Sequence, residues 1–202
     1  MGAEAEQMIA DSITALVSRR PSLASHVIER DDKLDALEIE IDELCYEILA
    51  LEKPVACDLR FVATALKIVK DIERVGDIAV NIAERTIELT EESELKHLLT
   101  LPGMAEDAQT ILRRSLDAFV NLDATLAQAV IESDRSIDAA FQRILKGVLR
   151  CMLEDPLAIN RWLKLIFVAK HLERVGDHSK NIAEMVIFMV RGQDVRRYRS
   201  TN

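Results

Sequence analysis

The chain has 202 residues, a formal net charge of −9 at pH 7, and only six Gly, four Pro and 4% aromatic residues. Because helix breakers are few and strong helix formers dominate, the composition predicts an all-helical protein. The negative charge argues against nucleic acid as a partner, because phosphate backbones are bound by clusters of Lys and Arg.

Six helices are predicted, because apolar residues recur at helical spacing in six segments. Pro21 and Pro54 each fit the first turn of a helix, and Asp123 is a suitable N-cap. The stretch 91–103 is predicted to connect two halves, and 193–202 to form a basic polar tail. In chain order the predicted helices cover residues 4–18, 21–52, 54–91, 104–120, 123–154 and 157–190.

A twelve-residue motif, Glu-Arg-Val-Gly-Asp-Ile-Ala-Val-Asn-Ile-Ala-Glu at 73–84, recurs at 173–184 with nine identical positions. The acidic stretches 29–35 and 132–138 also correspond. Each half is therefore predicted to be a short helix followed by a long antiparallel hairpin. The predicted fold is all-α, with six helices in two repeated three-helix bundles, and the predicted domains are residues 1–100 and 101–202.

The cysteines and the hydropathy bear on the cellular location. Cys45, Cys57 and Cys151 lack CxxC spacing, so neither a disulfide framework nor a thiolate metal site is predicted, and a reducing cytoplasm is favoured. No apolar run reaches the roughly 18 residues that a membrane span needs. Residues 1–10 lack the pattern of a signal peptide. The sequence therefore predicts a soluble, cytoplasmic protein.

Carboxylates on the two long helices of the first half lie at matched distances from the hairpin turn. At 1.5 Å per residue, Asp35 and Glu73 lie roughly 27 and 29 Å from the turn at 53–54. Asp31 and Asp77 lie roughly 33 and 35 Å from it. The four carboxylates are therefore predicted to face one another as two rungs.

The second half repeats this geometry from its turn near Asp155, with Asp138 opposite Glu173 and Asp134 opposite Asp177. An asparagine lies at the edge of each face, four residues after the last Asp. The predicted metal ligands of both halves are Asp31, Asp35, Glu73, Asp77, Asn81, Asp134, Asp138, Glu173, Asp177 and Asn181.

Carboxylates a few ångströms apart repel one another, and a cation with oxygen ligands removes that repulsion. The expected cofactor is a divalent or trivalent metal ion. Iron, Mg²⁺, Mn²⁺ or Ca²⁺ suit oxygen ligands, whereas Zn²⁺, also a candidate, usually prefers His or Cys. Gly76 and Gly176 each cost about 1 kcal/mol in a helix, which predicts a close approach by a neighbouring helix or a ligand. The alternative is that these acids form solvated faces, with Arg74 and Arg174 in surface ion pairs.

Two segments look like the paired signature repeats of the PhoU family: Leu-Lys-Ile-Val-Lys-Asp-Ile-Glu-Arg-Val-Gly-Asp at 66–77 and Phe-Val-Ala-Lys-His-Leu-Glu-Arg-Val-Gly-Asp-His at 167–178. Asp58-Leu-Arg60 also matches a segment before the first signature. The resemblance implies a homodimeric, cytoplasmic negative regulator of phosphate-starvation signalling. It implies two partners, the phosphate-specific ABC transporter and its sensor histidine kinase, through which alone the protein would touch the membrane.

The resemblance also implies that the acidic motif of the family, Glu or Asp followed four residues later by Asp, binds metal ions or clusters. In this chain the motif falls on the eight carboxylates named above. Members usually carry further residues before the first helix, whereas this chain begins at Met1-Gly2-Ala3, so a shortened first helix is expected.

Two other functions stay open. A ferritin-like di-metal enzyme needs two Glu-x-x-His motifs on bundle helices, and only Glu94-Leu-Lys-His97 fits. No candidate nucleophile or base in the repeated motifs supports catalysis, so the protein is not expected to be an enzyme. A purely structural bundle without metal remains compatible with the acidic composition. The four histidines are expected to be surface or packing residues: His26, His97, His171 and His178.

Overall fold

The computed structural model describes residues 1–94 and 101–192, and those residues contain helices and no strand. A short 3-10 turn, Pro156–Ala158, precedes the last helix. The α-helices in chain order are α1 (Gly2–Val17), α2 (Pro21–Glu29), α3 (Asp31–Leu51), α4 (Ala56–Thr90), α5 (Leu101–Val120), α6 (Ala124–Glu154) and α7 (Ile159–Arg191).

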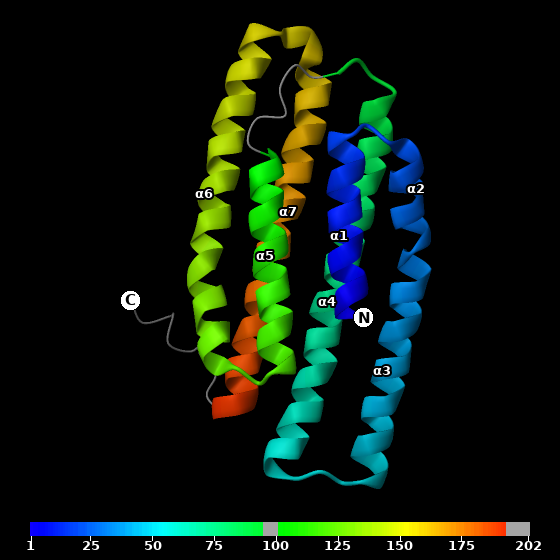
Figure 1. The fold of residues 1–202 in the computed structure, drawn as a ribbon, viewed down its shortest axis with the longest axis vertical. Helices are drawn as coiled ribbons and strands as arrows, with labels where there is room; N and C mark the ends of the chain where they lie inside the picture. Colours follow the sequence, from blue (N-terminus) through cyan, green and yellow to red (C-terminus); the bar gives the residue numbers. More distant parts are fainter. Residues whose placement is uncertain (95–100, 193–202) are drawn as a thin grey trace.

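The helices form two three-helix bundles that lie side by side, as Figure 1 shows. Helices α1, α2–α3 and α4 make the first bundle, and α5, α6 and α7 make the second. Helices α4 and α7, which carry the repeated motif, pack against each other between the bundles. The predicted fold class is confirmed, with α2 and α3 together corresponding to one of the six predicted helices. The predicted domain boundary at residues 100 and 101 remains a prediction.

The helix predicted over 21–52 is interrupted at Arg30. The N–H of Arg30 donates to the carbonyl of Val27 at 3.2 Å, which tightens the chain to a three-residue turn. The guanidinium of Arg30 donates to Glu4 at 2.6 Å and to Asp11 at 2.7 Å, both on α1. The break therefore lies at the residue whose ion pairs connect α1 to the start of α3.

The start of α5 also differs from the prediction. The helix begins at Leu101 rather than at 104, because Pro102 lies in its first turn, where a missing N–H is tolerated. Asp123 caps α6 as predicted, accepting from the N–H groups of Thr125 and Leu126 at 2.8 and 3.0 Å. The predicted connection and tail fall partly or wholly on segments 95–100 and 193–202, which lie outside the described residues.

Apolar side chains from both bundles pack into one continuous core. The inward faces of the motif helices contribute fully buried Ile82 on α4 and Leu165 on α7, and these pack with Met8 of α1 and Leu112 of α5. Burial of such side chains contributes roughly 1.5–3 kcal/mol each. None of the described helices has the length and apolar character required to cross a bilayer.

The ends of α4 and α7 are held by arginines from the opposite bundle. Arg60, near the start of α4, donates from Nε to the carbonyl of Met189 at 2.9 Å. Arg161, near the start of α7, donates from Nη1 to the carbonyl of Ser93 at 2.9 Å, just past the end of α4. Cations at a helix C-terminus also interact favourably with the helix dipole. Arginine hydrogen bonds therefore connect the two antiparallel motif helices at both ends.

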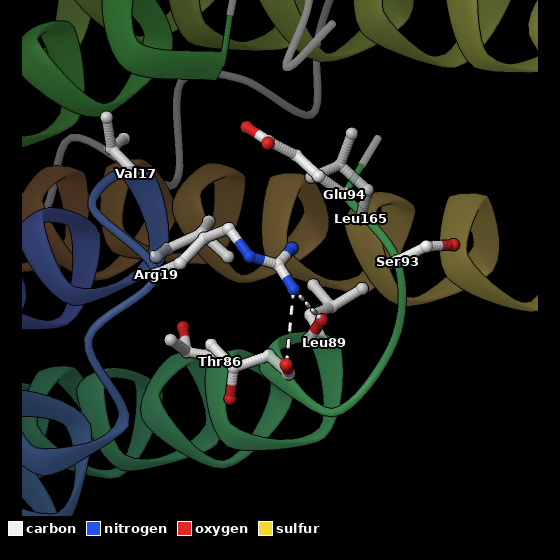
Figure 2. A pocket seen from close by; sticks show the side chains of 9 residues that line it. Val17, Arg19, Thr86, Leu89, Ser93, Glu94 and Leu165 are labelled. Atoms are coloured by element: carbon white, nitrogen blue, oxygen red, sulfur yellow. Dashed lines mark hydrogen bonds between the residues drawn. The ribbon is translucent and has the colours of Figure 1, made fainter. Parts of the chain in front are cut away.

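A third arginine caps the end of α4 from the turn between α1 and α2. Arg19 has a positive φ of 50°. Its Nη2 donates to the carbonyls of Leu89, Thr90 and Glu92 at 3.0, 3.2 and 2.6 Å. Figure 2 shows its guanidinium directed at the last turn of α4 beside a small cavity of about 30 Å³. This cavity has room for about one water molecule. We therefore assign Arg19 a structural role, connecting the α1–α2 turn to the end of α4, rather than a role in ligand binding.

Replacing Arg19 by Ala should lower the free energy of unfolding by about 1–2 kcal/mol, because three C-terminal carbonyls lose a charged donor. Alanine bears the strain of the positive φ as arginine does, so the change reports mainly on the lost hydrogen bonds. Urea denaturation measures the effect. The matched control is Arg20→Ala, the exposed neighbour, which should change stability by less than about 0.5 kcal/mol. Equal effects of the two substitutions would contradict the capping role.

Candidate metal centre

The repeated glycines allow the two helices of each hairpin to lie close together. A Cβ added to Gly76 would overlap Cδ2 of Leu34 on α3 and lie 3.6 Å from Oδ1 of Asp31. A Cβ added to Gly176 would lie 3.0 Å from Cδ1 of Ile137 on α6. The close approach predicted from these glycines is therefore confirmed, and the neighbouring helix is what approaches.

Close packing of α3 on α4 brings acids of both helices together. Asp35 and Glu38 of α3 and Glu73 of α4 each offer a carboxylate oxygen, and these three atoms lie within 4.8 Å of one another. The side chains of Glu38 and Glu73 are only 13% and 16% exposed. Two further acids lie close enough to influence this group electrostatically. We define the first acidic set as Asp31, Asp35, Glu38, Glu73 and Asp77.

Repulsion within the first acidic set is visible at two of its members. Burial raises the pKa of Asp31 above its ordinary value, and the carboxylates of Asp35 and Asp77 raise it further. Burial likewise raises the pKa of Glu73, with added contributions from Asp77, Glu38 and Asp35 that Arg74 partly opposes. Both acids therefore resist ionisation in the folded protein, which is the response expected of crowded carboxylates.

One carboxylate oxygen of the first acidic set lacks a hydrogen-bond donor. Oε2 of Glu73 is buried, no described residue donates a hydrogen bond to it, and Nε of Arg74 lies 3.5 Å away. Arg74 donates instead to Asp77 at 2.8 Å, and Lys70 pairs with Glu38. An oxygen-binding cation placed among these carboxylates would give Oε2 a partner, so the donor set fits a hard metal ion.

In the second hairpin, Asp134, Glu173 and Asp177 lie within electrostatic reach of one another, whereas Asp138 lines a surface cavity beside Asp134 and is not shown to join the other two. We define the second acidic set as the equivalent four carboxylates: Asp134, Asp138, Glu173 and Asp177. Asp134 is almost completely buried, with its side chain 4% exposed, and it forms an ion pair with Lys180. Glu173 forms an ion pair with Lys170. Burial raises the pKa of Asp177, and Glu173 and Asp134 raise it further, whereas Lys180 and Lys170 lower it. Asp138 is exposed.

The two asparagines that were predicted as ligands donate hydrogen bonds to different kinds of acceptor. Asn81 donates from Nδ2 to the backbone carbonyl of Asp77 at 2.6 Å. Asn181 donates to Oδ1 of Asp71 on α4 at 3.2 Å, and Nδ1 of His178 lies 2.8 Å from the same oxygen. Asn181 follows Glu173 by eight residues, which rotates it about 80° around the helix toward α4. The structure therefore turns Asn181 and His178 toward the contact between the bundles.

Two charged residues at these sites were not among the site residues predicted from the sequence. Glu38 belongs to the first acidic set, and its position three residues after Asp35 on the same helical face was the available signal. Lys180 is one of only three positions at which the repeated motifs differ, and Val80 is its counterpart. His171 does not add a cation near neutral pH, because burial and then Arg174 lower its pKa to about 4. Of the Glu94–His97 pair, His97 lies outside the described residues.

Comparison with known proteins identifies relatives over nearly the whole chain. The family model described as "PhoU domain" matches residues 1–86 and again 101–186. The phosphate-specific transport system accessory protein PhoU homolog of Pseudomonas aeruginosa is 41% identical over 197 residues, covering 97% of this chain and 81% of that protein.

Two solved structures share the fold. The crystal structure of PhoU from Pseudomonas aeruginosa superposes with a TM-score of 0.92 at 40% identity, covering 96% of this chain and 93% of that chain. The crystal structure of the phosphate transport system regulatory protein PhoU from Streptococcus pneumoniae superposes with a TM-score of 0.88 at 26% identity, covering 96% of this chain and 91% of that chain.

In the metal-free protein, replacing Glu73 by Gln should raise the free energy of unfolding at pH 7. A carboxyl whose pKa is raised on folding stabilises the fold at low pH, and this contribution is lost as the pH rises through the folded-state pKa. The gain at pH 7 should be about 0.5–1 kcal/mol, the upper range for charge pairs near a surface, and should vanish below about pH 4.

Urea denaturation in the presence of a chelator at both pH values measures this difference. Glu84→Gln is the control, because Glu84 is exposed on the same helix. A Glu73→Gln protein that is no more stable than the parent at pH 7 would show that the first acidic set is adequately solvated and needs no cation.

Proposed function

Because the chain belongs to the PhoU family, we propose that it acts as a regulatory accessory protein of a phosphate-specific transport system. It works as a cytoplasmic adaptor between the phosphate-specific ABC transporter and the sensor histidine kinase, and it dampens phosphate-starvation signalling when phosphate is plentiful. The observation that carries the proposal is the match of both repeats, in fold and in sequence, to proteins named for that system. The proposal further includes a homodimer as the working unit.

An adaptor needs surfaces that other proteins can reach, and the ends of the hairpins provide them. The α3–α4 and α6–α7 turns lie at opposite ends of the molecule (Figure 1). Leu51 and Val55 at the first turn are 69% and 71% exposed, and Leu153 and Leu157 at the second are 84% and 95% exposed. Exposed apolar side chains gathered in this way are typical of contact surfaces. Two such ends support contact with more than one partner.

The proposed function includes metal binding by the acidic sets. Asp35, Glu38 and Glu73 would hold the ion in the first repeat, with Asp31 and Asp77 beside them. The ion would supply positive charge that joins α3 to α4. Oxygen ligands favour Mg²⁺, Mn²⁺ or iron over Zn²⁺. A ferritin-like enzyme receives no support, because the close group of possible ligands among the described residues consists of Asp35, Glu38 and Glu73 and includes no histidine.

Deleting the gene in its host should raise phosphate uptake and keep phosphate-starvation genes expressed in phosphate-rich medium, because the regulator that dampens the signal is gone. A starvation-responsive reporter and phosphate uptake measure the two effects. Expression of the full chain from a plasmid should restore both to the parental level, and the Glu84→Gln chain should do the same. Unchanged reporter expression in the deletion strain would instead indicate a role with another transporter.

Mn²⁺ should raise the melting temperature at pH 7, because an ion that binds only the folded protein adds about 2.7 kcal/mol at one hundred times its dissociation constant. For a chain of this length that corresponds to a rise of roughly 5–10 °C. The rise should shrink near pH 4, where protons compete for the carboxylates. Glu73→Gln should reduce it strongly, and Glu84→Gln should preserve it. An equal rise in both variants would place the ion elsewhere.

A further inference from the structure

We propose that the two repeats are not equivalent metal sites, because the ammonium group of Lys180 takes the place of a cation in the second acidic set. A divalent cation then binds the first acidic set in strong preference to the second. This inference rests on the proposed metal binding, and it concerns which repeat binds and which residue decides the choice. Lys180 is the specificity-determining residue.

The first observation is the ion pair between Lys180 and Asp134. Aligning the repeated motifs at an offset of 100 residues matches Lys180 with Val80, so the first repeat has no amine at this position. The side chains of Lys180 and Asp134 are only 23% and 4% exposed. A carboxylate buried to this extent needs a charged partner, and removing that partner is strongly destabilising. Asp134 therefore already has the cation that Asp31, its counterpart, lacks within the described residues.

The second observation is the loss of a ligand. The offset of 103 that matches Asp31 with Asp134 and Asp35 with Asp138 matches Glu38 with Phe141. Glu38 supplies one of the three close oxygens of the first acidic set, whereas Phe141 supplies none. The ring of Phe141 instead lies 5.5 Å below Nζ of Lys170, a cation–π contact.

The balance of charge differs accordingly. The first acidic set has five carboxylates, and its paired cations, Lys70 and Arg74, have side chains that are 59% and 56% exposed. The second set has four carboxylates paired with Lys170 and the largely enclosed Lys180. Exposed cations move aside at little cost, because surface ion pairs contribute about 0–1 kcal/mol. A metal ion entering the second set would have to displace Lys180 from Asp134 or bind next to its ammonium group. The second arrangement places two positive charges within a few ångströms of each other, where they repel strongly.

Mn²⁺ titration of the full chain at pH 7, with free Mn²⁺ followed by its electron paramagnetic resonance signal, tests the inference. The parent protein should bind about one tight Mn²⁺ per chain. Glu73→Gln should abolish that binding and Glu173→Gln should preserve it. Lys180→Val, which copies the first repeat, should add a second ion with affinity at least about tenfold above that of the parent second set. The reciprocal Val80→Lys should weaken the first site by a similar factor.

Lys180→Gln provides a second variant if Lys180→Val folds poorly, because it removes the charge and keeps a polar side chain. Its metal-free form should melt below the parent at pH 7, since Asp134 loses its charged partner, and Mn²⁺ should reverse more of that loss than it adds to the parent. Circular dichroism establishes that each variant is folded.

Two equal Mn²⁺ sites in the parent protein, or unchanged Mn²⁺ binding in both Lys180 variants, would overturn the inference. Failure of the proposed metal binding has a different signature. A parent protein without Mn²⁺ binding, together with Lys180 variants that gain one ion, would refute metal binding by the first acidic set while supporting the role of Lys180. Absence of Mn²⁺ binding from every variant would refute both.

Discussion

The close packing of paired helices at Gly76 and Gly176 determines the chemistry of this molecule. Without side chains at these positions, α3 and α6 lie so near α4 and α7 that acids on facing helices crowd together. Burial and mutual repulsion then raise the pKa of Asp31, Glu73 and Asp177. Close helix packing thus gains apolar contact but crowds carboxylates, and their ionised forms are stabilised only by a nearby positive charge.

The two repeats differ in the positive charge that lies beside these carboxylates. In the second repeat, Lys180 neutralises buried Asp134 from within the chain. In the first repeat, Glu73 retains a buried oxygen without a hydrogen-bond donor among the described residues, and Glu38 adds one more carboxylate. Under the proposed metal binding, a chain built from two copies of one bundle would have one hairpin that takes its positive charge from a metal ion and one that takes it from Lys180. Helices α4 and α7 pack against each other and exchange arginine caps, so the two hairpins are in direct physical contact.

Much of this arrangement follows from the sequence, because the rise of an α-helix is fixed. Equal distances from a turn placed Asp31 near Asp77, and the structure brings them within electrostatic reach. The break at Arg30 was not predictable, since it depends on ion pairs with distant acids of α1. Glu38 could have been found from its spacing. The ion pair of Lys180 could not, because a long flexible side chain can turn toward solvent or toward a neighbouring helix.

The most direct measurement is the anomalous scattering of Mn²⁺ in crystals of the full chain grown near neutral pH with the metal present. We expect one strong anomalous peak per chain, bounded by carboxylate oxygens of Asp35, Glu38 and Glu73, with the ion pair between Lys180 and Asp134 intact. Peaks of equal height at both acidic sets, or a single peak between Asp134 and Asp177, would contradict this expectation.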